Sequence, residues 1–112
     1  MSDALDPGLA DLLHQAEADL DAAAGGAAVC VFTKAGTAVP GIKYHEGRRA
    51  ALKEVARRCR RTSERPSAAA GEVRADWAEH LERLTERGAG ADWIAYRQGG
   101  LDALADLAPA AP

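Results

Sequence analysis

The chain has 112 residues, of which 47% are hydrophobic and 28% are charged, and its formal net charge is −3. This length fits a single domain, and so small a net charge does not by itself indicate nucleic acid, a membrane surface or any other charged partner. No apolar run approaches the roughly 20 residues that a membrane-spanning helix needs, and no basic-then-apolar segment at the N-terminus indicates export.

The two cysteines, Cys30 and Cys59, stand in apolar surroundings without paired spacing, which is typical of a reducing compartment. We therefore expect a cytoplasmic protein, and the many alanines, arginines and glycines favour a bacterial source. Aromatic residues make up only 4% of the chain, and alanine contributes little area to a core. For this reason we expect a homodimer, in which a second copy supplies further packing.

The expected fold is mainly α, with about four helices and one short two-stranded β-hairpin between helices one and two. We assign residues 1–107 to a single small helical domain and residues 108–112 to a short disordered tail. The first helix has Asp6 as its cap and Pro7 at its first position, and leucines follow at helical spacing. Gly25-Gly26 ends this helix.

The stretch after the first helix changes period. Residues 27–32 form a continuous apolar run that predicts a buried strand, and residues 38–44 can return antiparallel after a turn. Because Pro40 has no N–H to donate, the returning strand should lie at an edge or break there.

Three further helices are expected from apolar spacing and from polar residues or glycines at their ends. They run from about Glu46 to Arg61, from a cap at Ser67 to Arg87, and from a cap at Asp92 onward.

The last of these helices contains Gly99-Gly100, and each glycine there costs roughly 1 kcal/mol relative to alanine. This cost predicts a kink or a close backbone contact. The rings of Trp77 and Trp93 are both expected in the core rather than in a ligand site.

One internal similarity links the second and fourth helices. Two helices that each open with Tyr-x-x-Gly could pack in a similar way, with glycine letting another element approach, although Ala and Leu matches arise easily in an alanine-rich chain. At a constant offset, Ile42, Tyr44, Gly47, Ala51, Leu52 and Ala56 match Ile94, Tyr96, Gly99, Ala103, Leu104 and Ala108.

The charges are arranged in blocks. Residues 1–26 carry six acidic residues and no Lys or Arg, whereas residues 43–65 carry nine basic residues against three Glu. Opposite an apolar stripe, the second helix has a basic face formed by Arg49, Lys53, Arg57, Arg60 and Arg61. Either the two blocks face each other in the fold, or the basic face meets an anionic partner.

The basic face is the strongest functional candidate, because guanidinium groups match phosphate oxygens and such contacts release counterions. It favours a binding or regulatory protein that contacts nucleic acid or an acidic protein. The alternative is a solvated face, or one paired with the first helix through ion pairs that contribute little individually. The predicted binding residues are Arg49, Lys53, Arg57, Arg60, Arg61 and Arg97.

A weaker candidate for catalysis is the cluster of Tyr44, His45 and Glu46, where a phenol, an imidazole and a carboxylate could carry out acid–base work. Alternatively, Glu46 only favours the helix dipole, Tyr44 packs and His45 is exposed. A small biosynthetic tailoring enzyme or binding protein could hold a peptide or small molecule in a reactive conformation, in a groove near the hairpin that includes Tyr96-Arg97. A structural subunit of a larger assembly is the third possibility.

No metal, cofactor or membrane partner is expected. His14, His45 and His80 fall on separate helices, and neither cysteine has a potential ligand at close spacing. The glycines of Gly25-Gly26 and of residues 88–90 are explained as helix stops, and no phosphate-cradling glycine loop is present in the sequence.

Overall fold

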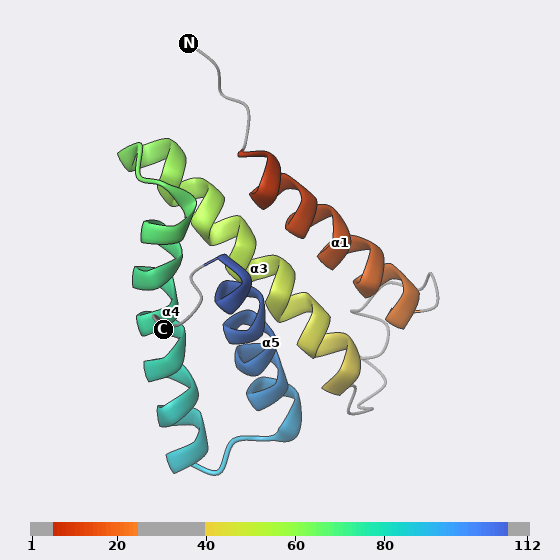
Figure 1. The fold of residues 1–112 in the computed structure, drawn as a ribbon. Coiled ribbons are helices and arrows are strands. Elements are labelled where there is room, and N and C mark those ends of the chain that lie inside the picture. Colours follow the sequence, from red (N-terminus) through yellow and green to blue (C-terminus); the bar gives the residue numbers. More distant parts are fainter. Residues whose placement is uncertain (1–5, 25–39, 108–112) are drawn as a thin grey trace.

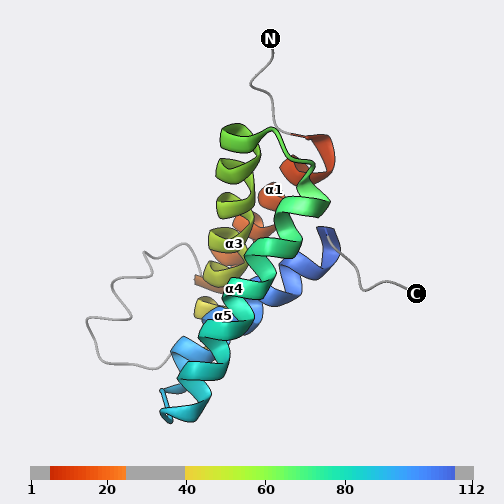
Figure 2. The same ribbon diagram turned by 90° about the vertical axis from the view of Figure 1, so that its left-hand side faces the viewer.

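The computed structural model describes residues 6–24 and 40–107, which fold into helices packed around a central one (Figure 1). The helices are α1 (Pro7–Ala24), α3 (Pro40–Thr62), α4 (Pro66–Glu86) and α5 (Ala91–Leu107). The central helix α3 packs against each of the other three, and α5 also packs along α4, as Figure 2 shows from the side. None of the described residues lies in a strand, so the expectation of a small helical protein is confirmed for them.

The predicted β-hairpin is wrong. Its returning strand would span residues 38–44, but α3 already begins at Pro40. Proline suits the first position of a helix because that residue's N–H has no intrahelical partner, and Ile42 is buried with Leu20 and Ala24 of α1. The local pattern of this segment predicted a strand, but in the structure the segment is helical and packs against α1. The other predicted strand, residues 27–32, lies outside the described residues, as does the predicted tail.

Helix α1 begins as predicted. The Asp6 carboxylate accepts hydrogen bonds from the backbone N–H groups of Gly8 (3.1 Å) and Leu9 (3.3 Å), which satisfies two of the donors that a helix leaves open at its first turn. The predicted stop at Gly25-Gly26 lies just outside the described residues. The buried side of α1 consists of Leu9, Leu13, Ala16, Leu20 and Ala24.

Two of the predicted helix caps are wrong. Helix α4 begins at Pro66, with Arg65 as its N-cap residue and no side chain capping it, so Ser67 already lies in the first turn. Helix α5 begins at Ala91, and Asp92 likewise lies in its first turn. Arginine has no side-chain acceptor for the N–H groups of the first turn, so α4 starts without a side-chain cap, although Pro66 suits its first position.

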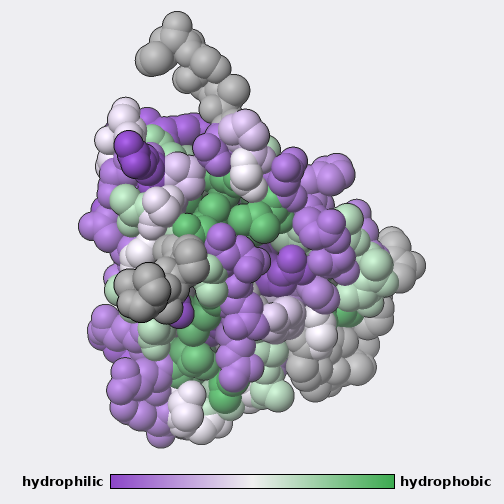
Figure 3. Space-filling view, in the orientation of Figure 1, coloured by the Kyte–Doolittle hydropathy of each residue, from purple (hydrophilic) through white to green (hydrophobic). Residues whose placement is uncertain are grey.

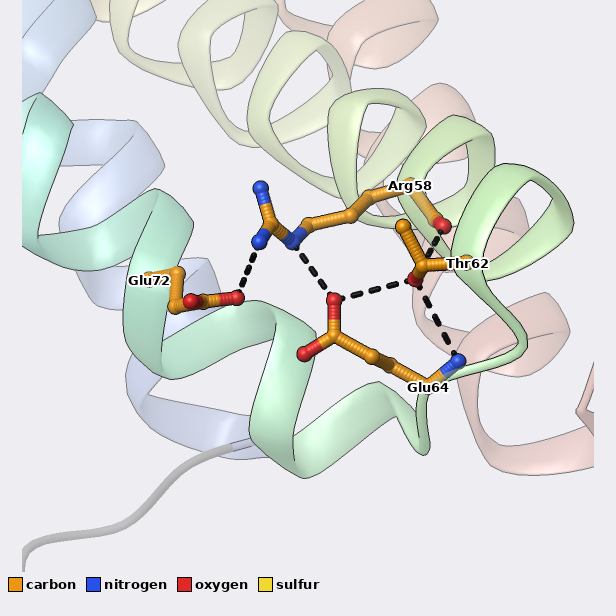
Figure 4. A network of polar contacts seen from close by, with 4 residues as sticks. All are labelled: Arg58, Thr62, Glu64 and Glu72. Carbon is orange, nitrogen blue, oxygen red and sulfur yellow. Dashed lines mark hydrogen bonds and ion pairs between the residues drawn. The ribbon is translucent and has the colours of Figure 1, made fainter.

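A polar network joins the end of α3 to α4 (Figure 4). Arg58 Nε donates a hydrogen bond to Glu64 Oε1 at 2.8 Å, and the same guanidinium also pairs with Glu72 of α4. Thr62 Oγ1 lies 2.8 Å from the Arg58 carbonyl oxygen and 3.0 Å from Glu64 Oε1. Hydrogen bonds from Thr62 and then Arg58 lower the pKa of Glu64, so the carboxylate is held in its charged form.

Helices α3 and α5 cross at two glycines that are placed reciprocally. A Cβ on Gly47 would lie 1.8 Å from the carbonyl oxygen of Tyr96, and a Cβ on Gly99 would lie 1.9 Å from the carbonyl oxygen of Tyr44. Because both contacts are with backbone, no side-chain movement could relieve them, and glycine alone allows this approach. The predicted close backbone contact in the last helix is confirmed, and the two Tyr-x-x-Gly segments pack on each other.

The two tryptophans have different surroundings. Trp77 is 3% exposed, and its ring lies so close to Gly100 that a Cβ there would come within 2.3 Å of ring atoms. Trp93 is 56% exposed, so the expectation that it belongs to the core is wrong. Trp93 lies two turns before Gly100 and therefore on the same side of α5. It is nevertheless exposed, because it belongs to the first turn of the helix and the buried residues of α5 begin only at Gly99.

The surface is largely hydrophilic on the face drawn in Figure 3, where apolar atoms gather on the two sides of α5, towards α1 and towards α4. A search of the described helices for one long and apolar enough to span a membrane found none.

Candidate anion-binding site

The basic residues of α3 fall into two groups. Lys43, Arg48 and Arg58 have carboxylate partners: Lys43 pairs with Glu46 of the same helix, Arg48 Nη1 lies 2.7 Å from Asp19 Oδ2 of α1, and Arg58 belongs to the network of Figure 4. The hydrogen bond from Arg48 lowers the pKa of Asp19. In the described part of the chain, the other group makes no ion pair and consists of Arg49, Lys53, Arg57, Arg60 and Arg61.

This second group coincides with the binding residues predicted on the basic face, and its members are accessible. Lys53, Arg57, Arg60 and Arg61 are exposed, and Arg49 is half-buried. Helix α1 packs beside them through its leucines and does not cover them. Among the described residues, the ion pair that joins the acidic and basic blocks is between Arg48 and Asp19, and it uses none of these five side chains.

A concave surface of about 420 Å³, which we call the first groove, lies where α3, α4 and α5 meet. Three of the unpaired basic side chains of α3 line it, namely Arg49, Lys53 and Arg57, and Arg97 of α5 adds a fourth. The tertiary structure thus brings the predicted binding residue Arg97 next to three of the predicted binding residues on α3.

Two carboxylates also line the first groove, and each already has a partner. Glu46 Oε1 lies 3.1 Å from Lys43 Nζ, and Glu54 Oε1 accepts a hydrogen bond from the indole N–H of Trp77 at 3.1 Å. Lys43 offsets the charge of Glu46, whereas the neutral indole leaves the charge of Glu54 in place. Four basic side chains against two carboxylates still give the first groove an excess of positive charge.

Arg97 is held in place by aromatic rings. Its guanidinium carbon lies 4.4 Å from the centroid of the Trp77 ring and 5.5 Å from that of Tyr96. The two rings are themselves stacked, with centroids 5.3 Å apart and planes at 23°. Stacking over an aromatic face stabilises a guanidinium without using its N–H donors, so Arg97 is oriented while its donors stay available to an anion.

A second groove, of about 390 Å³, lies on the other side of the basic face, between α1 and α3. Lys53 and Arg57 line this groove as well as the first one, whereas Arg60 lines the second groove and not the first. Glu17 of α1 contributes a carboxylate to its wall. Lys53 and Arg57 form the ridge between the two grooves and are the side chains that a ligand in either one would meet, whereas Arg61 lies outside both.

The three weak catalytic candidates do not form one site. Tyr44 donates a hydrogen bond to Asp102 of α5, and this contact raises its pKa to about 12, so the phenol keeps its proton at neutral pH. His45 Nδ1 lies 3.0 Å from Arg48 Nη1 of the same helix. Glu46 points instead into the first groove, where it pairs with Lys43.

The described residues contain no group of three potential metal ligands close enough to hold an ion. His14, His45 and His80 lie on α1, α3 and α4. Burial raises the pKa of the Cys59 thiol, which disfavours the reactive thiolate; Cys30 lies outside the described residues.

Sequence reasoning missed the aromatic floor of the first groove and the role of Glu54. Trp77 was recognisable as a core residue but not as the support for Arg97, because the contact joins α4 to α5.

No family model, curated protein or solved structure matches the chain.

Proposed function

We propose that this protein binds an anionic partner, a nucleic acid or an acidic protein, through the basic face of α3 together with Arg97. The observation that carries the proposal is the unbalanced charge of the first groove. Four basic side chains line it against two carboxylates, and one of these, Glu46, is paired with Lys43.

The contrast with the other bases of α3 supports this proposal. Arg48 and Arg58 sit at helix–helix contacts and have carboxylate partners, whereas the bases of the first groove make no ion pair with any residue that the structure describes. Like charges that line a concave surface focus the electrostatic potential and raise the local concentration of anions. Guanidinium groups add planar forks that match carboxylate and phosphate oxygens.

The direct test is retention on immobilised polyanions at low salt. We expect the purified protein to bind single-stranded DNA, duplex DNA or poly-L-glutamate resin, and to elute as KCl rises from about 50 to 200 mM, because salt weakens contacts of this kind. The variant Lys53→Ala/Arg57→Ala should lose retention, since both residues line the two grooves.

The matched control is Arg65→Ala/Arg74→Ala, which removes the same charge from the α3–α4 connection and from α4, outside the first and second grooves. It should elute at nearly the wild-type salt concentration. If the control and the groove variant elute together, net charge rather than the groove is responsible. If the wild-type protein is not retained on any of the three resins, the proposal is wrong.

A second candidate is a protein that holds a small anionic substrate in the first groove, as the tailoring-enzyme alternative requires. The volume of the first groove falls in the range of small-molecule sites, and its floor is aromatic. A saturable rise in Tm with inorganic phosphate or citrate, abolished by Arg97→Ala, would favour this candidate over a polymeric partner.

The homodimer is a further proposal. Light scattering at several protein concentrations tests it, and a monomer mass throughout would refute it. The third possibility, a structural subunit, predicts a large exposed apolar patch on the isolated protein.

A further inference from the structure

A third groove, of about 530 Å³, lies between α4 and the start of α5. Its basic lining residues are His80, Arg83 and Arg87 from α4 and its C-terminal end, and Arg97 from α5, and Glu86 adds one carboxylate. Arg97 also lines the first groove, so the two grooves meet at this side chain. Arg83 pairs with Glu79, whereas Arg87 makes no ion pair with any described residue.

The wall of the third groove also carries Trp93, whose side chain is 56% exposed. Its ring packs edge-on against Tyr96, with centroids 6.4 Å apart and planes at 73°, and Lys43 Nζ lies 5.6 Å from its centroid. Tyr96 in turn stacks on Trp77. A line of three rings therefore runs from the floor of the first groove to an indole at the surface, flanked by cations.

We propose that the first and third grooves together bind single-stranded nucleic acid, with phosphates at the basic side chains and a base stacked on Trp93. This inference rests on the proposed anion-binding function and names the class of its partner. A single strand alternates anionic phosphates with planar bases, and sequence-tolerant sites for it combine a basic groove with exposed aromatic rings.

The architecture disfavours duplex DNA. A helix that reads a duplex protrudes into the major groove, but α3 is the central helix of this fold (Figure 1). Four of its basic side chains line concave surfaces that neighbouring helices bound. In a duplex, moreover, the faces of the bases are stacked on each other and are not available to an indole. An acidic peptide such as poly-L-glutamate would satisfy the cations but has no ring to cover Trp93.

The test is a titration with fluorescein-labelled oligothymidylate of about ten nucleotides at low salt, with the matching duplex and poly-L-glutamate as competitors. We expect unlabelled oligothymidylate to displace the labelled strand at a lower concentration than the duplex or poly-L-glutamate does. Trp93→Leu keeps an apolar side chain but removes the stacking face, and it should weaken binding about 5- to 100-fold. Trp93→Phe retains a ring and should retain most of the affinity.

The control is Arg65→Ala, a charge removed outside the grooves, which should change the affinity little. Near-UV circular dichroism and Tm verify that both Trp93 variants are folded. Wild-type affinity in Trp93→Leu, or equal competition by duplex DNA or poly-L-glutamate, would overturn this inference and leave anion binding intact. No binding to any of the three polyanions would overturn the proposed function as well.

Discussion

The crossing of α3 and α5 and the first groove beside it involve the same two helices, yet they are built in opposite ways. At the crossing, Gly47 and Gly99 leave no room for even one methyl group. In the first groove, a short distance along the same helices, long basic side chains line a concave surface and have no ion-pair partners among the described residues.

This difference separates the residues that hold the fold from those that are available for a partner. A close backbone contact is sensitive to any added atom because helix backbones cannot move independently of their neighbours. Unpaired surface cations contribute little to stability, so they can be replaced with small effect on the fold. The following substitutions test this division.

The largest effect is expected for Gly47→Ala or Gly99→Ala. Each added Cβ would overlap a backbone carbonyl oxygen of the other helix, and we expect a loss of about 3 kcal/mol or more in the free energy of unfolding. Urea denaturation measures it. Gly71→Ala is the control, because Gly71 lies inside α4 with open space around it and should gain roughly 0.5–1 kcal/mol. Wild-type stability in both crossing variants would show that the backbones are not in close contact.

A smaller loss is expected for Gly100→Ala, in which the new Cβ meets the Trp77 ring and not backbone. The ring can shift, but it is stacked on Tyr96 and hydrogen-bonded to Glu54. We therefore expect a loss of about 1–3 kcal/mol in the free energy of unfolding. Near-UV circular dichroism should change as the ring moves. An unchanged spectrum together with an unchanged Tm would contradict the packing of Trp77 on α5.

The hydrogen bond from Tyr44 to Asp102 predicts a pH-dependent effect. Folded Tyr44 has a pKa of about 12, whereas an unfolded tyrosine loses its proton near pH 10. Between these values the folded state binds more protons, so this contribution to stability is complete below pH 10 and is lost as the pH rises towards 12.

In Tyr44→Phe this contribution is absent. The difference in the free energy of unfolding between wild type and variant, about 1 kcal/mol at neutral pH, should therefore shrink over this range. Urea titrations at pH 8, 10 and 11 measure the difference. If the difference in the free energy of unfolding between wild type and variant stays constant up to pH 11, the hydrogen bond between Tyr44 and Asp102 is excluded.

The smallest effect on stability is expected for Lys53→Ala/Arg57→Ala, within about 0.5 kcal/mol of wild type. Arg58→Ala, which leaves Glu64 and Glu72 without their shared partner, should lower the Tm more than the double groove variant does. If the double groove variant lowers the Tm more than Arg58→Ala does, the groove bases support the fold and are not set apart from the residues that hold it together.

Several elements of this fold were predictable because their causes are local. The cap at Asp6, the leucine spacing of α1 and the basic stripe of α3 depend on residues within a few turns of each other. The Tyr-x-x-Gly similarity also pointed correctly to a close approach at Gly99. The hairpin prediction failed because the segment around Pro40 and Ile42 has an apolar pattern that fits strand or helix, and contact with α1 accompanies the helical form.

For the site, the sequence by itself determined which side chains form the basic face of α3, since helical spacing alone places Lys53 and Arg57 together. Only the tertiary structure decided that Arg97 joins them, that Glu54 accepts a hydrogen bond from Trp77, and that Trp93 lies at the surface. The physical reason is the range of the contacts: periodicity orders residues along one helix, whereas pairing, stacking and exposure depend on how separate helices meet.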